Sequence, residues 1–157
     1  PFDLLQDPEA IANWPLTLSR DGVRTPLPWH ADVVHGGFSS GTPWLPMSTG
    51  NIARAVDRQD ANPASLLNLT RELVRLRRGD AALRQGSCQV LLADDACLVL
   101  RRKLDEQGTI AVFNISARPV PWPHAAPLEG RVLAAVNGAA PGVLPAWGAL
   151  WMEMGKA

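Results

Sequence analysis

The sequence predicts a mainly β protein in which a long loop and one helix precede an antiparallel β-sandwich. Three observations support this fold class. Residues 1–61 are rich in proline and glycine and show little hydrophobic periodicity. An amphipathic segment follows over 62–80, and from residue 86 onward apolar residues recur at every second position. Because a period of two is typical of half-buried strands, we expect a C-terminal sandwich, with a small barrel as the alternative.

The N-terminal part has the composition of a loop. Its stretches NWPLTL, RTPLPW and SSGTPWLP are rich in proline. Proline removes a backbone donor and restricts the residue before it, so these stretches disfavour helices and strands. Loops this long inside a compact protein are usually functional.

One strong helix is predicted over NPASLLNLTRELVRLRRGD, residues 62–80. Asn62 suits the N-cap position, Pro63 suits the first helical position, and Gly79 can end the helix. Four leucines spaced by three, four and three residues form one apolar stripe on this helix: Leu66, Leu69, Leu73 and Leu76.

Five short strands are predicted after the helix. Asp-Asp, Gln-Gly, Asn-Gly and Pro-Gly pairs lie near their ends, and such pairs favour turns. The strand sequences are SCQVLLA, CLVLRRKL, TIAVFNIS, RVLAAV and ALWMEM.

Composition limits the function classes. The 157 residues carry 15 Lys+Arg and 15 Asp+Glu, so the formal net charge is zero. No global basic field would recruit nucleic acid or an anionic membrane. The apolar runs are all shorter than the roughly 18 residues that a transmembrane helix needs. The N-terminal PFDLLQDPEA lacks the basic region of a signal peptide.

The two cysteines indicate a reducing compartment. A hairpin turning at Asp94-Asp95 would place Cys97 opposite Leu92 and Cys88 opposite Arg101. The thiols would then share a face without opposing each other, which argues against a disulfide. We therefore expect two reduced, core-facing thiols and a cytoplasmic location.

The stretch RDGVRTPLPW, residues 20–29, is the strongest functional signal. Arg20 and Arg24 flank Gly22, whose freedom permits a backbone turn, and Pro26 and Pro28 stiffen the rest of the stretch. Guanidinium groups bind carboxylates or several sugar hydroxyls. The residues alone leave two roles open: arginines buried in loop–loop hydrogen bonds, or an arginine that faces a polar ligand.

This region resembles the segment after the seventh barrel strand in α-glucosidases of the α-amylase superfamily, glycoside hydrolase family 13. The oligo-1,6-glucosidase branch has a pattern close to Q-D-P, W-P, G-R-D-G-x-R-T-P-M-P-W, G-F-S/T and P-W-L. The helix is similar to the family's S-L-L-N-x-x-R-x-L-I-x-L-R, and ALRQGSCQVL to A-L-x-x-G-x-Y-x-x-L. Leu27, Ser19 and Cys88 depart from the usual Met, Gly and Tyr. The matching residues, in order, are Gln6-Asp7-Pro8, Trp14-Pro15, Arg20-Asp21-Gly22, Arg24-Thr25-Pro26, Pro28-Trp29, Gly37-Phe38-Ser39, Pro43-Trp44-Leu45, Ser65-Leu66-Leu67-Asn68, Arg71, Leu73, Leu76 and Arg77.

The resemblance implies a layout and a substrate-binding residue. Residues 1–85 would be the last βα loop and final helix of a truncated (β/α)8 catalytic barrel, and residues 86–157 the C-terminal antiparallel β-domain. Loops on that face of a barrel carry the active site. Arg20 would hold the sugar in the innermost subsite. Arg24 is expected to brace the loop, with ligand contact as the alternative, and Trp44 is the best aromatic candidate for the ligand.

No catalytic residue is predicted within the chain. Retaining glycosidases need two carboxyl groups about 5 Å apart, and the family places its three catalytic acids on barrel strands that precede the matched region. We interpret the chain's own acids as capping, turn or surface groups: Asp3, Asp7, Glu9, Asp21, Asp32, Asp57, Asp60 and Glu72. His30 and His35, with Asp32 between them, are interpreted as ordinary loop residues, so neither a metal nor a cofactor is expected.

The sequence therefore predicts a C-terminal, non-catalytic part of a retaining α-glucosidase. The alternatives are a stand-alone carbohydrate-binding module and a structural β-module. The predicted partners are an α-glucoside or oligosaccharide, bound by the complete enzyme, and the remainder of the barrel. Self-association through the leucine stripe could replace the barrel contact.

Overall fold

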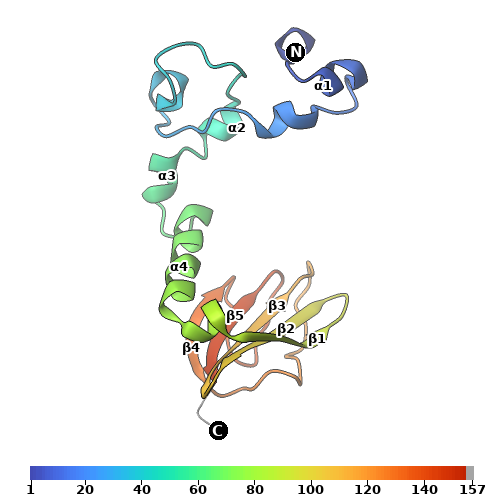
Figure 1. Ribbon diagram of the computed structural model, residues 1–157, viewed down its shortest axis with the longest axis vertical. Helices are drawn as coiled ribbons and strands as arrows, with labels where there is room; N and C mark the ends of the chain where they lie inside the picture. Colours follow the sequence, from blue (N-terminus) through green and yellow to red (C-terminus); the bar gives the residue numbers. More distant parts are fainter. Residues whose placement is uncertain (155–157) are drawn as a thin grey trace. The chain divides into compact units, whose positions relative to one another are not determined.

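The computed structural model describes residues 1–154 and divides the chain into two compact units (Figure 1). The first unit is Pro1–Arg71, and the second begins at Glu72. The boundary at residues 85 and 86 that the resemblance implies stays a prediction. None of the helices in the described part of the chain combines the length and the hydrophobicity needed to cross a bilayer.

The first unit contains short helices where the sequence predicted loop. Side-chain caps start two of them: Asp7 accepts a hydrogen bond from the N–H of Glu9, and Ser48 accepts one from the N–H of Asn51. Each segment stays short because proline and glycine recur every few residues. The helices are η1 (Phe2–Leu4), α1 (Pro8–Asn13), η2 (Ser19–Val23), η3 (Val34–Gly37), α2 (Thr49–Ile52) and α3 (Val56–Asp60).

Large apolar side chains of this unit lie mostly on its surface. Its buried apolar residues are few: among residues 1–71 they are Ala10, Pro26, Pro28, Leu45 and Ala55. An exposed large side chain loses the stabilisation that burial would give it. The exposed ones include Phe2, Ile11, Leu16, Val23, Trp29, Val34, Phe38 and Trp44.

Helix α4 (Leu66–Gly79) begins later than the sequence predicted. The expected N-cap at Asn62 is wrong, because its side chain accepts a hydrogen bond from the N–H of Ala64 in a tight turn. Ser65 starts the helix instead: its hydroxyl accepts from the N–H of Asn68 at 3.2 Å. The predicted end at Gly79 is confirmed, and none of the α4 residues is buried.

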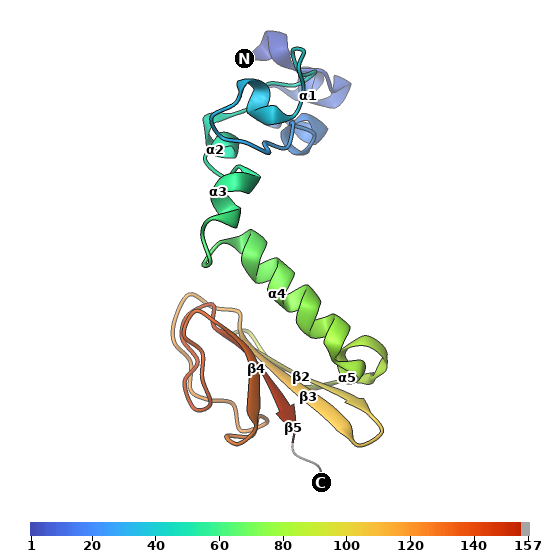
Figure 2. The same ribbon diagram turned by 90° about the vertical axis from the view of Figure 1, so that its left-hand side faces the viewer.

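The second unit contains one five-stranded antiparallel sheet with the order β1-β2-β3-β5-β4 (Figure 2). All five predicted strands are confirmed. A further short helix that the sequence analysis missed, α5 (Ala81–Gln85), precedes β1 and is capped by Asp80. The strands are β1 (Ser87–Ala93), β2 (Cys97–Leu104), β3 (Gln107–Asn114), β4 (Arg131–Val136) and β5 (Ala149–Met154).

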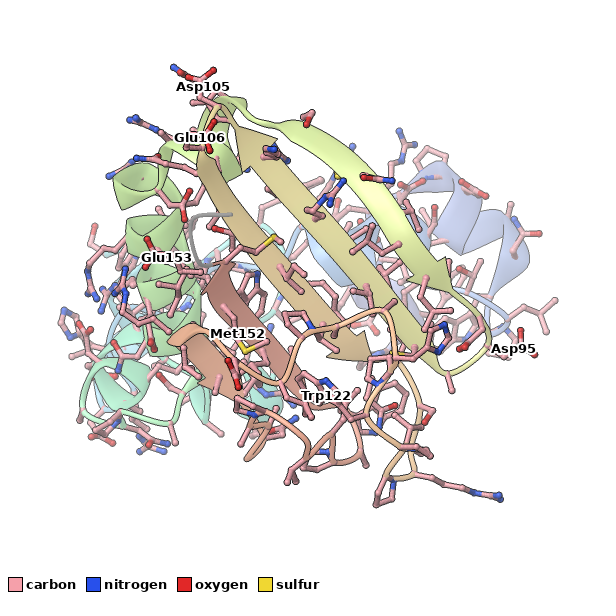
Figure 3. All side chains as sticks on the ribbon, turned by 90° about the horizontal axis from the view of Figure 1, so that it is seen from below. Asp95, Asp105, Glu106, Trp122, Met152 and Glu153 are labelled. Atoms are coloured by element: carbon pink, nitrogen blue, oxygen red, sulfur yellow. The ribbon has the colours of Figure 1, made fainter. Side chains whose placement is uncertain are left out.

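The second sheet of the expected sandwich is replaced by loops. The described strands form a single sheet, and loop residues pack on its core face. Trp122 belongs to a loop on this side of the sheet, and its ring packs against the core that includes Met152 of β5 (Figure 3). These loops form isolated bridges, such as the pair Val120 and Leu144, whereas a second sheet would consist of complete strands. The core consists of Cys97, Val99, Ile110, Val112, Ala126, Ala139, Leu144, Leu150 and Met152.

Helix α5 packs against β2 and β3. The Thr109 hydroxyl of β3 donates to the Asp80 carboxylate at 2.7 Å, which ties the N-terminus of α5 to the sheet. Gly86 follows α5, and a Cβ there would lie 2.5 Å from the carbonyl oxygen of Ala82 and 2.7 Å from that of Lys103. Only glycine therefore fits at the junction between α5 and β1.

The cysteine prediction is partly wrong. Both thiols are free, and Cys97 is buried, but Cys88 is exposed rather than core-facing. A bulge between Val90 and Leu92 shifts the register, so that Cys88 pairs with Arg102 instead of Arg101. One inserted residue changes which face of the sheet each side chain occupies, so the bulge is sufficient to explain why Cys88 is exposed.

Candidate functional site

Arg20 lies in η2 and is anchored by a carboxylate 13 residues earlier in the chain. Its Nε donates to Oδ2 of Asp7 at 2.6 Å, and its Nη2 donates to Oδ1 at 3.3 Å. The side chain of Asp7 is 1% exposed, whereas that of Arg20 is 57% exposed. One edge of the guanidinium group is thus fixed on a buried partner while much of the side chain faces outward.

Asp7 has two structural roles. It caps α1, whose first residue is Pro8, and it pairs with Arg20. The hydrogen bond from Arg20 is the main cause that lowers the pKa of Asp7, and Asp7 in turn raises the pKa of Arg20. Both groups are therefore held in their charged forms.

Asp21, beside Arg20, is a buried carboxylate that fixes the start of α1. Its Oδ2 accepts from the backbone N–H groups of Gln6 at 2.7 Å and of Asp7 at 2.9 Å. The residue is 5% exposed. Asp7, Arg20 and Asp21 therefore form one network that joins the Gln-Asp-Pro and Arg-Asp-Gly motifs.

The proline-rich segment after Arg20 is held by backbone hydrogen bonds. The N–H groups of Trp29 and His30 both donate to the carbonyl oxygen of Gly36, at 2.7 and 2.9 Å. Gly36 has a φ of 62°, and a Cβ there would lie 2.9 Å from Cβ of Pro28, so glycine is required. This loop has a defined shape.

The side chains of Trp44 and Arg24 make no hydrogen bond to Asp7, Arg20 or Asp21 within residues 1–154. Trp44 is 61% exposed and borders a hollow with Leu4 and His35, whereas Arg20 does not line that hollow. The guanidinium group of Arg24 donates no hydrogen bond to residues 1–154, although its backbone N–H bonds Asp21. The expected bracing by the Arg24 side chain is therefore not seen in the described part of the chain.

Several of the remaining candidate acids and histidines contact other residues of the first unit. His30 Nδ1 lies 3.6 Å from Oδ2 of Asp57, and Arg58 lies 3.3 Å from Asp32. The Asp57 carboxylate accepts from the N–H of Ala31. Over residues 1–154, no group of three or more His, Cys, Asp or Glu side chains could hold a metal ion.

The sequence analysis missed the functional partnership of Asp7 and Asp21 with Arg20. A signal for Asp7 was present, because an Asp-Pro pair is typical of a helix N-cap followed by the first helical residue. The pairing itself joins residues 13 positions apart, and no local pattern predicts such a contact.

The chain is similar to a known protein family and to several of its members. The family model described as "Alpha amylase, catalytic domain" matches residues 3–86. A probable alpha-glucosidase of Rhizobium meliloti (strain 1021) is 35% identical over 157 residues, which cover 98% of this chain and 28% of that protein. The probable oligo-1,6-glucosidase 2 of Bacillus subtilis (strain 168) is 35% identical over 125 residues, covering 78% of this chain and 22% of the relative.

A solved structure agrees with these relatives. The alpha-glucosyl transfer enzyme XgtA matches 98% of this chain and 29% of its own chain, with a TM-score of 0.80 and 31% sequence identity. The chain thus spans less than a third of the proteins that it resembles. The family model covers more than half of the chain and includes the whole network around Arg20. The chain belongs to the alpha-amylase family.

Proposed function

We propose that this chain is the C-terminal, non-catalytic part of a retaining α-glucosidase that acts on α-glucosides in carbohydrate metabolism. It contributes a loop of the substrate pocket and the β-domain. The observation that carries the proposal is Arg20, an arginine within the family-matched region whose guanidinium is anchored by Asp7 and whose side chain is 57% exposed.

The geometry of Arg20 suits sugar binding. A guanidinium group presents several donors in a rigid fork, and sugar hydroxyls accept from such donors. The two contacts to Asp7 fix the fork before a ligand arrives. Pre-organisation of this kind lowers the entropy lost on binding, so the remaining donors bind a hydroxyl more strongly than those of a mobile arginine.

Several acids of the first unit are engaged in structural contacts. Asp7 pairs with Arg20, Asp21 holds two N–H groups, and Asp60 pairs with Arg71. Glycoside hydrolysis with retention needs a nucleophile and an acid/base about 5 Å apart. In the proposed enzyme both carboxyl groups come from polypeptide outside these 157 residues.

The exposed apolar surface of the first unit supports the proposal that further polypeptide packs against it. In the proposal, residues 1–85 complete a (β/α)8 barrel, and the remainder of that barrel covers the exposed apolar side chains. Self-association through Leu66, Leu69, Leu73 and Leu76 is the alternative for the chain by itself.

A chimera tests the role of Arg20. This chain replaces the matched C-terminal region of the Rhizobium meliloti relative, and hydrolysis of p-nitrophenyl α-D-glucoside is measured. We expect activity in the chimera and a fall in kcat/KM of about 100-fold or more for Arg20→Ala, the scale expected when one charged contact to the reacting sugar is lost.

Arg58→Ala is the matched control for this experiment. Arg58 is another exposed arginine of the first unit, and it pairs with Asp32. We expect this variant to keep the activity of the parent chimera. An Arg20→Ala chimera as active as the Arg58→Ala chimera contradicts the proposal.

A further inference from the structure

A wide hollow of about 810 Å³, open to solvent, lies on the second unit between the loop that follows β3 and the loop that follows β4. The first loop contributes Trp122, His124, Leu128 and Glu129, and the second contributes Gly142. A Cβ at Gly142 would lie 3.6 Å from Cδ2 of Leu128, so the two loops approach each other here. All the lining residues belong to the second unit, so the hollow does not involve the apolar surface of the first.

Trp122 gives the hollow an aromatic wall that is held in a defined shape. The side chain is half-buried: it packs against the core of the sheet and also lines the hollow (Figure 3). Its Nε1 donates to the carbonyl oxygen of Ala126 at 3.1 Å, and the N–H of Ala126 donates to the carbonyl oxygen of Pro123 at 3.0 Å. A ligand bound here would therefore order little additional chain, which favours binding.

Two polar side chains accompany this apolar surface. His124 and Glu129 are exposed, and neither side chain makes a hydrogen bond or an ion pair with another of residues 1–154. Leu128 is 62% exposed, so the apolar part of the lining is accessible as well. The hollow thus offers an apolar surface together with a carboxylate acceptor and an imidazole that can donate or accept.

This combination fits a pyranose ring. One face of a pyranose consists of C–H groups, which pack on an aromatic side chain, and its rim carries hydroxyl groups that need hydrogen-bond partners. Glu129 can accept from hydroxyls in charge-assisted hydrogen bonds, and His124 can serve the same ring. A purely apolar ligand would leave both polar groups unused, and a cation would have no use for the imidazole N–H.

We infer that this hollow is a carbohydrate site that holds one glucosyl unit of an α-glucan on Trp122 and Leu128, with its hydroxyls bonded to Glu129 and His124. The choice of an α-glucan rests on the proposed function of the chain. Glu129 is the single carboxylate among the described lining residues, whereas glycoside hydrolysis needs two. The site therefore tethers a long substrate and does not cleave it.

The test is a titration of the isotope-labelled full chain with maltotriose, monitored by NMR chemical shifts. We expect a Kd of about 1–10 mM, as a shallow site for one sugar unit allows. The saturable shifts should map to the indole N–H of Trp122 and the backbone N–H groups of Ala126, Leu128 and Gly142. Tetrahydropyran-2-methanol keeps the ring but lacks the ring hydroxyls, so it should bind at least about fivefold more weakly.

Absence of saturable shifts at these groups, or equal binding of tetrahydropyran-2-methanol, overturns the inference. The titration measures no turnover, so this failure is distinguishable from failure of the proposed hydrolytic function, which the chimera measures.

Glu129→Ala is the diagnostic variant, because the side chain is exposed and has no partner among residues 1–154 whose loss would disturb the fold. We expect maltotriose to bind at least about fivefold more weakly, as the loss of charge-assisted hydrogen bonds predicts. The control Glu106→Ala removes an exposed acid from the turn between β2 and β3 and should leave binding unchanged (Figure 3). Equal binding to the two variants overturns the inference.

Leu128→Lys tests the apolar part of the site. It replaces an apolar lining residue with an ammonium group that can pair with Glu129, so maltotriose binding should weaken by at least about fivefold. Ile115→Lys is the matched control, because Ile115 is an exposed apolar residue of the second unit that does not line the hollow. Undiminished binding to a folded Leu128→Lys variant also overturns the inference.

Discussion

Asp7 and Asp21 lie 14 positions apart in the sequence and belong to one network. Asp7 pairs with Arg20, and Asp21 holds the start of α1, so the two aspartates together position the arginine. At the scale of the residue, the contacts decide the protonation states. The hydrogen bond from Arg20 lowers the pKa of Asp7 in the folded chain. A lowered folded-state pKa stabilises the fold at pH values above the unfolded pKa and ceases to do so as the carboxyl becomes protonated.

Acid titration of thermal stability tests this contact. For the parent chain, the contribution of Asp7 should be fully present above about pH 4 and lost as pH falls through the lowered pKa. Asp7→Asn keeps an oxygen for the cap of α1 but removes the charge, so its melting temperature should be lower at neutral pH and should fall less on acidification below about pH 4. Circular dichroism melts measure this, with Asp3→Asn as the control. Parallel curves for the parent and Asp7→Asn contradict the assignment.

Single residues of the site were only partly predictable. Arg20 could be found because its motif is local and dense in arginine, glycine and proline. The contacts of Asp7 with Arg20 and of Asp21 with the start of α1 could not be found, because both acids look like ordinary capping and turn residues until the fold brings them together. Arg24 shows the converse: it was expected to brace the loop, yet its side chain donates no hydrogen bond within residues 1–154.

At the scale of the element, the junction between α5 and β1 depends on Gly86. Gly86→Ala should lower the free energy of unfolding by about 1–3 kcal/mol, because the new Cβ meets two backbone oxygens that cannot move independently. Gly79→Ala is a matched control, since a Cβ there meets nothing within 4 Å and alanine favours helix. Urea unfolding measures both, and equal stability of the two variants contradicts this explanation of the junction.

The core face of the sheet gives a second prediction at this scale. Leu150 is fully buried in β5, so Leu150→Ala should cost about 2–5 kcal/mol through lost burial and the cavity left behind. Val90 in β1 is largely exposed, and Val90→Ala should cost less than about 1 kcal/mol. The midpoint of urea unfolding, followed by tryptophan fluorescence, separates the two. A small loss for Leu150→Ala would place the core elsewhere.

The strands were predictable because each is a short apolar-rich segment with turn-forming residues near its ends. The bulge in β1 was not, since nothing local at Val90 and Leu92 distinguishes a bulged residue from a paired one, and it moved Cys88 to an exposed position. The loops that replace a second sheet were also missed, because short apolar stretches around Val120 and Leu144 suit either arrangement.

At the scale of the whole molecule, exposed apolar surface predicts association. Leu66 is 73% exposed, and none of the residues of α4 is buried. The chain by itself should therefore show a sedimentation coefficient that rises with concentration. Leu66→Lys combined with Leu69→Lys should reduce this rise, whereas Leu128→Lys with Val143→Lys, two exposed apolar residues of the second unit, should not. A chain that stays monomeric at all concentrations contradicts this prediction.

The central proposal is that the catalytic acids lie outside this chain. Its most direct test is the release of p-nitrophenol from p-nitrophenyl α-D-glucoside by the purified 157-residue chain. In the proposal the catalytic acids come from polypeptide outside these residues, so we predict no release above the uncatalysed background, even at high chain concentration. Sustained turnover by the pure chain would show that it contains its own catalytic acids and would contradict the assignment of Arg20 to a pocket completed by other polypeptide.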